Sequence, residues 1–101
     1  MPEFKAVAKL SDVPEGRGIT TRAVGHILAL FNIDGQIYAM QGLCPHKGGP
    51  LGDGYCENGF TYCPLHGWKF EIKTGACIDF PDKAAQSYKA RVVGDTIEVE
   101  L

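Results

Sequence analysis

The sequence has no long hydrophobic run. Its longest apolar segment, Ile27–Phe31, has five residues, whereas a helix that crosses a bilayer needs about 20. An excess of charge is also missing, because 10 Lys and Arg accompany 12 Asp and Glu and leave a formal net charge of −2. Such a chain has neither the basic surface that binds nucleic acid nor the polybasic anchor of a membrane-surface protein. We therefore expect no nucleic-acid partner and no membrane partner.

Cysteine is too sparse for a small scaffold held together by disulfides. The 101 residues include four Cys, fewer than the roughly 8% typical of such scaffolds. The N-terminal residues Met1–Lys5 also lack the charged-then-apolar pattern of a secretory signal. We therefore expect a reducing, cytoplasmic location, where cysteines serve more often as ligands than as disulfides.

The length and composition fit one domain that spans residues 1–101. A hydrophobic content of 45% supports one packed core, and a chain of this size has little room for a second. No window keeps a helical apolar period over ten residues. Short apolar stretches separated by turn signals instead predict an antiparallel all-β domain.

Turn dipeptides predict where the strands pair. Asp34-Gly35, Asn58-Gly59, Thr74-Gly75 and Gly94-Asp95 each separate two apolar stretches, as the tight turn of a β-hairpin does. The stretch over 26–33 is apolar enough to be buried on both faces, whereas the last stretch alternates apolar and acidic residues. The expected strands cover residues 4–8, 26–33, 36–40, 55–57, 60–62, 68–72, 76–80, 88–93 and 96–101.

Two loops rich in Gly and Pro each contain a cysteine and a histidine. The first reads Cys44-Pro45-His46 and the second reads Cys63-Pro64-Leu65-His66, with sixteen residues between His46 and Cys63. Those sixteen residues include the expected Asn58-Gly59 hairpin, which should bring the two pairs together. Two thiolates and two imidazoles at neighbouring loop tips predict a metal site made of Cys44, His46, Cys63 and His66.

This pattern resembles the Rieske [2Fe–2S] binding motif. The residues that follow it, Gly67-Trp68-x-Phe70 and then Thr74-Gly75, also resemble those of soluble Rieske ferredoxins. The resemblance implies one [2Fe–2S] cluster, with Cys44 and Cys63 on one iron and His46 and His66 on the other. The architecture expected with it is an antiparallel Rieske-like sandwich or partly open barrel, with a small cluster-binding lobe at about residues 43–68.

Four positions depart from the respiratory members of that family. Those proteins join the two loops with a disulfide where this chain has Gly49 and Leu65. They also place hydroxyl groups near the cluster where this chain has Trp68 and Phe70. Because each lost O–H···S hydrogen bond leaves the reduced cluster less stabilised, we expect a reduction potential at the low end of the Rieske range, roughly −150 to +300 mV.

The resemblance implies an electron carrier rather than an enzyme. Such a protein passes single electrons from a flavoprotein reductase to a terminal oxygenase, and a monomer suits this mobile role. A second hypothesis is the small Rieske subunit of an NAD(P)H-dependent nitrite reductase, whose partner would be the large subunit. A third is a structural Cys₂His₂ zinc module, because the ligand types also permit zinc.

The remaining notable residues have simpler interpretations. Cys56 and Cys77 are expected to be structural, with a disulfide between them as the lesser alternative. His26 is expected to be a packed or surface residue. Trp68 either caps the core or contacts a partner. Four phenylalanines are expected in the core: Phe31, Phe60, Phe70 and Phe80.

Overall fold

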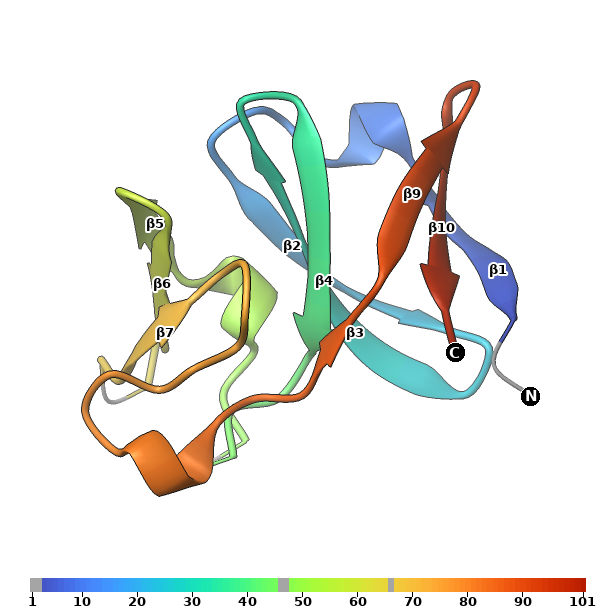
Figure 1. The fold of residues 1–101 in the computed structure, drawn as a ribbon. Coiled ribbons are helices and arrows are strands. Elements are labelled where there is room, and N and C mark those ends of the chain that lie inside the picture. The colour runs from blue at the N-terminus through green and yellow to red at the C-terminus, as the bar shows by residue number, and fades with distance from the viewer. Residues whose placement is uncertain (1–2, 46–47, 66) are drawn as a thin grey trace.

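Ten strands form three antiparallel sheets in a computed structural model, which describes residues 3–45, 48–65 and 67–101 (Figure 1). The strands are β1 (Phe4–Lys9), β2 (Gly18–Ala23), β3 (His26–Ile33), β4 (Gln36–Gln41), β5 (Tyr55–Glu57), β6 (Phe60–Tyr62), β7 (Lys69–Glu71), β8 (Ser87–Tyr88), β9 (Ala90–Val93) and β10 (Thr96–Glu100). Three short 3₁₀ turns complete the elements: η1 (Leu10–Asp12), η2 (Leu51–Asp53) and η3 (Pro81–Lys83). In these described ranges no helix is long and apolar enough to cross a membrane. The prediction of an antiparallel all-β domain is confirmed.

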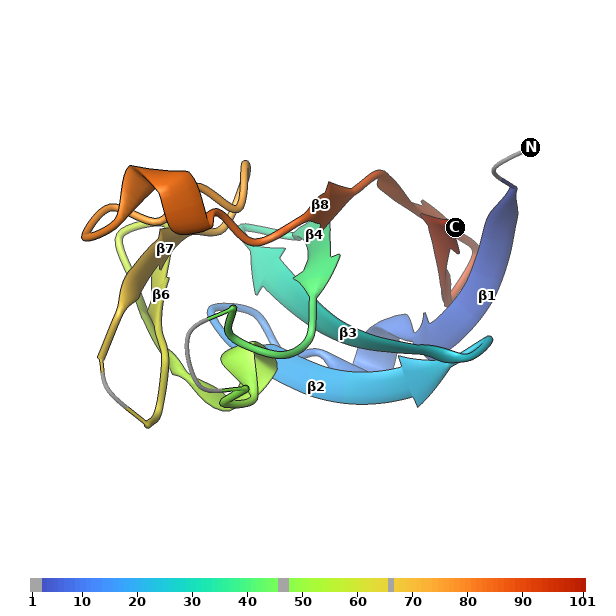
Figure 2. The same ribbon diagram turned by 90° about the horizontal axis from the view of Figure 1, so that it is seen from below.

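Two of the sheets form the base of the molecule and the third forms a separate lobe. The base sheets have the strand orders β2-β3-β4-β8 and β1-β10-β9, and they approach each other where β1 meets β2 and where β4 meets β9. The small sheet, β5-β6-β7, lies to one side of this base in both views (Figures 1 and 2). The arrangement matches the expected partly open β base with a smaller lobe beside it.

Strand β3 is shared by two hydrophobic cores. Leu28 and Leu30 pack with residues of β4 and β10 between the base sheets. Ala29 and Phe31 pack with residues of the small lobe on the opposite face. Since successive side chains of a strand point to opposite faces, every residue from Leu28 to Asn32 is buried. The expectation that this strand is buried on both faces is confirmed.

Two of the hairpin signals, Asp34-Gly35 and Asn58-Gly59, give the turns that they predict. Asp34 and Gly35 have φ angles of 53° and 85°, and Asn58 and Gly59 have 54° and 85°. Positive φ at both central residues is what a type I′ turn requires. The bounds of β3, β5 and β6 are those expected from the sequence.

The sequence reasoning did not predict strand β2. It pairs with β3 along its whole length, from Gly18 opposite Phe31 to Ala23 opposite His26. Its turn is Val24-Gly25, with φ angles of 53° and 77°. A β-branched residue is rare in that conformation, so the dipeptide gave no turn signal.

The expected strand over 76–80 is wrong. Only Cys77 pairs there, in an isolated bridge with Phe70. The Asp79 carboxylate accepts the Lys69 N–H at 2.8 Å, where a continuing strand would offer a carbonyl. Pro81 has no N–H to donate to a strand ladder, so the pairing cannot continue there. The 3₁₀ turn η3 begins at this residue.

The expected strand over 88–93 is split between the two base sheets. Tyr88 pairs with Ala39 of β4, whereas Ala90 pairs with Val99 of β10. The chain therefore changes sheets at Lys89. The passage from one base sheet to the other is the thin segment that follows β8 in Figure 2.

Two of the four phenylalanines expected in the core are not buried. Phe31 and Phe70 are fully buried, as expected. Phe60 is only half-buried, and Phe80 is 45% exposed. Phe80 follows the end of the β7 pairing, so it lies outside the sheet that covers the core.

Candidate metal centre

The first cysteine loop is a closed turn that runs from Cys44 to Gly49. The Gly48 N–H donates to the Cys44 carbonyl at 2.9 Å, and the Cys44 N–H donates to the Gly49 carbonyl at 2.7 Å. Leu43 and Pro50 form a β-bridge across the base of the loop. These contacts fix both ends of the loop against each other.

The second cysteine loop, from Cys63 to Trp68, repeats the same hydrogen bonds. The Gly67 N–H donates to the Cys63 carbonyl at 2.8 Å, and the Cys63 N–H donates to the Trp68 carbonyl at 2.9 Å. Gly48 and Gly67 occupy equivalent positions and share a φ of 74°, a conformation that favours glycine. The described ends of the two loops therefore share one pattern of backbone hydrogen bonds, and each pattern begins at a cysteine.

The two cysteines reach one core. Cys44 and Cys63 are each 3% exposed and belong to the hydrophobic cluster that includes Phe31 and Phe70. The small lobe provides Cys63 at the end of β6, while β4 leads into the loop of Cys44. Buried thiols at the first residue of each loop are suited to bind a metal that prefers thiolate ligands, shielded from water.

Gly49 brings the first loop against the second. A Cβ at this position would lie 2.7 Å from the Cys63 Sγ and 3.0 Å from the Leu65 Cγ. The space beside the Cys63 sulfur is therefore shaped by a residue without a side chain. A backbone this close to a thiolate is the kind of cradle that an iron–sulfur site uses.

Only part of the predicted ligand set can be placed. His46 and His66 lie outside the described residues, as does Lys47. Among the residues that the structure does describe, no group of three or more His, Cys, Asp and Glu could hold a metal. The structure thus brings Cys44 and Cys63 into one core, and all four ligand assignments stay a prediction.

The other two cysteines lie apart from these loops. All four cysteines are among the described residues and none forms a disulfide, so the alternative of a Cys56–Cys77 bridge is wrong. Cys77 is buried in the core, as a structural cysteine is expected to be. Cys56 is half-buried on β5, and burial raises the pKa of its thiol, an effect that the Thr61 hydroxyl opposes.

An aromatic pair lies at the end of the second loop. The rings of Trp68 and Phe80 have centroids 4.2 Å apart and an interplanar angle of 31°. Trp68 is half-buried and packs against the core, while Phe80 stays exposed. Both sequence interpretations of Trp68 remain compatible with this position.

Sequence reasoning missed Asp79. Its carboxylate accepts a hydrogen bond from the Lys69 N–H at 2.8 Å. Lys69 directly follows Trp68 in the chain, and Phe80 directly follows Asp79. No local pattern predicts this contact because its partners are ten residues apart and one of them is a backbone amide. The hairpin signal at Thr74-Gly75 was the only indication that the two segments meet.

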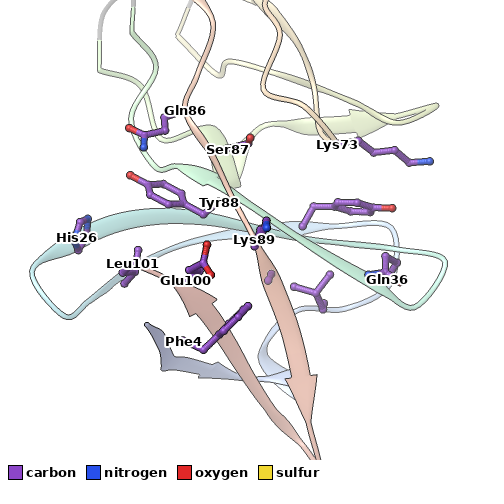
Figure 3. A pocket seen from close by; sticks show the side chains of 13 residues that line it. Phe4, His26, Gln36, Lys73, Gln86, Ser87, Tyr88, Lys89, Glu100 and Leu101 are labelled. Atoms are coloured by element: carbon purple, nitrogen blue, oxygen red, sulfur yellow. The ribbon is translucent and has the colours of Figure 1, made fainter. Parts of the chain in front are cut away.

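A wide groove lies on the base, away from the described residues of the cysteine loops. It has a volume of about 970 Å³ and runs beside β4, β8 and the end of β10 (Figure 3). Its lining includes charged residues of both signs, namely Lys73, Lys89 and Glu100. His26 is exposed at one end of this groove, and its ring forms a T-shaped pair with the Tyr88 ring at an interplanar angle of 76°. None of the described residues of the two cysteine loops lines the groove.

The chain resembles known proteins over most of its length. The family model of the Rieske [2Fe-2S] domain matches residues 3–93. The ferredoxin component of the naphthalene 1,2-dioxygenase system of Pseudomonas putida is 34% identical over 99 residues, which are 97% of this chain and 94% of that protein.

Solved structures share the fold over nearly the whole chain. A ferredoxin of Sphingomonas yanoikuyae B1 has a TM-score of 0.87 and 26% identity, covering 98% of this chain and 99% of that one. A complex of reduced oxygenase and oxidized ferredoxin in carbazole 1,9a-dioxygenase contains a chain with a TM-score of 0.83, 25% identity and coverage of 96% and 92%. The small subunit assigned to an NADH-dependent nitrite reductase of Mycobacterium tuberculosis, at 24% identity, a TM-score of 0.88 and coverage of 100% and 96%, shares the fold.

Proposed function

The chain belongs to the Rieske [2Fe–2S] domain family, and on that premise we propose that it is the ferredoxin component of an aromatic-ring dioxygenase system. In this function it is an electron carrier and not an enzyme. The observation that supports it most directly is a relative with this function that matches the chain almost from end to end. The cofactor that the family implies is one Rieske [2Fe–2S] cluster.

The residues of this chain fit such a cluster. We infer that Cys44 and Cys63 hold one iron, and that His46 and His66 hold the other. Support comes from the two buried thiols on matching loops and from the narrow space beside the Cys63 sulfur. When bound, the cluster accepts and releases one electron. The two loops exclude water from the sulfur ligands, because both thiols lie in the apolar core.

The three histidines of the chain provide a matched test of the nitrogen ligands. We expect His66→Ala and His46→Ala to lose the cluster and its visible absorption, since a metal site without one ligand binds far more weakly. His26→Ala should keep both, because His26 is exposed on the base. Iron content and absorption spectra measure the outcome. Full iron content in His66→Ala would contradict the assignment.

We further propose that the reduction potential is low for a Rieske centre. Phe70 is fully buried behind the second loop and Trp68 ends that loop. Neither side chain offers a hydroxyl to a cluster sulfur, so the added negative charge of the reduced state is stabilised less. Redox titration should give a value near the low end of the range, about −150 mV. A potential in the positive hundreds of millivolts would contradict this part.

The proposed partners are a flavoprotein reductase as donor and a terminal oxygenase as acceptor. A cytoplasmic location and a monomeric state suit a carrier that meets them in turn. Support comes from the relative in a naphthalene dioxygenase system and from the ferredoxin–oxygenase complex among the structural neighbours.

Reconstitution tests the function directly. The reductase and oxygenase components of the naphthalene 1,2-dioxygenase system of Pseudomonas putida are combined with NADH and naphthalene, without their own ferredoxin. Adding the purified chain should start product formation, and the cluster-free His66→Ala variant should not. Product formation that is equal with and without the chain would contradict the proposal.

The small subunit of a nitrite reductase is the second candidate. The favouring observation is the fold shared with such a subunit at a TM-score of 0.88. Co-purification of the chain with a large nitrite reductase subunit, and nitrite-dependent oxidation of NADH by that complex, would decide for this function. A chain that purifies alone and supports naphthalene oxidation decides against it.

A further inference from the structure

Several exposed apolar side chains of the small lobe belong to the second cysteine loop or stack on it. Leu65 is 54% exposed within this loop. Phe80 is 45% exposed and stacks on Trp68, the last residue of the loop. We propose that Leu65, Trp68 and Phe80 form an apolar platform on which the terminal oxygenase docks. This inference rests on the proposed function and specifies the chemistry by which its acceptor is recognised.

Leu65 connects the platform to the predicted centre. Its Cγ and the Cys63 Sγ both lie within 3.0 Å of the point where a Gly49 Cβ would be. The side chain is therefore next to a predicted sulfur ligand and also accessible to solvent. A partner that covers Leu65 therefore comes close to the predicted cluster, and electron transfer requires such closeness.

The aromatic pair is held in place before any partner arrives. The Asp79 carboxylate accepts a hydrogen bond from the Lys69 N–H at 2.8 Å, and the Ile78 N–H donates one to the Lys69 carbonyl at 2.8 Å. These bonds fix the residue after Trp68 and the residue before Phe80. A ring that is already ordered loses little conformational entropy on binding, which is a property of interface anchors.

The three side chains of the platform carry no charge, and the exposed Asp82 and Lys83 that follow Phe80 in η3 are of opposite sign. The Asp79 carboxylate accepts a hydrogen bond from the Lys69 N–H. The Lys69 ammonium lies 4.3 Å from the centre of the Phe60 ring, on the outer face of the small sheet. The matching surface of the oxygenase should accordingly be apolar, and its affinity should depend little on salt.

The oxygenase is the occupant that the observations favour. Among the structural neighbours, a ferredoxin chain that aligns with 96% of this one is found in complex with an oxygenase. The reductase is the other protein that could use the platform. The experiment therefore measures binding to both proteins.

The test uses the cluster-loaded protein and the oxygenase and reductase components of the Pseudomonas putida naphthalene system as probes. Phe80→Ala and Leu65→Ala are compared with Phe80→Tyr, which keeps the ring, and with Tyr55→Ala. Tyr55 is a matched control because it is an exposed aromatic residue of the same lobe on β5, outside the loop. Absorption spectra first establish that each variant holds its cluster. Dissociation constants are then measured at about 50 mM and about 500 mM NaCl.

We expect Phe80→Ala and Leu65→Ala each to weaken oxygenase binding by about tenfold, with both controls unchanged and the wild-type constant nearly independent of salt. Equal oxygenase binding by Phe80→Ala and the wild type would overturn the platform while leaving the proposed function intact. The platform would also be overturned if the variants lost affinity for the reductase alone, or if wild-type binding to the oxygenase weakened steeply with salt. A wild-type protein that reduces cytochrome c but neither binds nor reduces the oxygenase would contradict the proposed function itself, and the platform with it.

Discussion

Gly49 is a residue whose missing side chain matters to the predicted centre. A Cβ there would press on the Cys63 Sγ at 2.7 Å, and the buried sulfur has little room to move. We predict that Gly49→Ala lowers the iron content and destabilises the protein by about 1–3 kcal/mol. Iron analysis and denaturant unfolding measure both effects.

Gly48 provides the control for this substitution. It lies one position away in the same loop, and a Cβ there meets no atom within 4 Å. Its φ of 74° is one that Asn tolerates. Gly48→Asn should therefore keep its iron, and a Gly49→Ala protein with equally full iron content would show that the contact is unimportant.

Val24 is strained in the turn between β2 and β3. Its φ is 53° and its side chain is 55% exposed, so it bears an unfavourable backbone conformation without the benefit of burial. We predict that Val24→Asn, which creates the Asn-Gly sequence preferred in type I′ turns, stabilises the protein by about 1 kcal/mol. Unfolding in urea measures the change. A lower stability of the variant would contradict the argument.

Cys56 gives the stability of the protein a dependence on alkaline pH. Burial raises the pKa of its thiol above 9.0, so the folded chain holds this proton more tightly than the unfolded chain. The resulting stabilisation is complete below the unfolded pKa, about 8.5, and is lost as pH rises through the folded pKa. We predict that wild-type stability falls more steeply than that of Cys56→Ala as pH rises above about 8.5. Parallel stability curves for the two proteins would contradict this.

At the scale of elements, the Asp79 side chain adds one contact with β7 to the backbone bridge that the segment from Cys77 to Lys83 makes at Cys77. Asp79 replaces the carbonyl that a continuing strand would offer to Lys69 N–H. We predict that Asp79→Ala costs about 1 kcal/mol and speeds hydrogen exchange at the Lys69 and Ile78 amides. Asp82→Ala, in the exposed turn η3, should change neither quantity. Unchanged exchange in Asp79→Ala would mean that the aromatic pair is held by other contacts.

The elements that the sequence predicts correctly are those with local signals. The turn at Asn58-Gly59 defines β5 and β6, because positive φ at two residues can be recognised from the dipeptide alone. Strand β2 was missed because Val24 occupies the equivalent turn position against its own preference. The change of sheets at Lys89 could not be predicted, since it is determined by which neighbour, β4 or β10, each half of the segment meets.

At the scale of the whole molecule, the shared strand β3 joins the base to the lobe. Phe31 lies in the same core as Cys44 and Cys63, so the scaffold and the predicted ligands are packed as one unit. The spacing of the motif predicts Cys44 and Cys63 as the sulfur ligands, and the structure buries both in one core. It could not predict the contacts of Gly49 and Asp79, which depend on segments far apart in the chain folding against each other.

The most direct test of the account is low-temperature EPR of the dithionite-reduced protein, combined with metal and acid-labile sulfide analysis. We predict two iron atoms and two sulfides per chain, as a [2Fe–2S] cluster requires, and a signal with nitrogen couplings from two imidazoles. Wild-type protein and Cys56→Ala should give the same spectrum, because Cys56 lies apart from the two loops. A colourless protein that contains one zinc ion and no sulfide when grown with sufficient iron would contradict the account and leave the structural Cys₂His₂ module in its place.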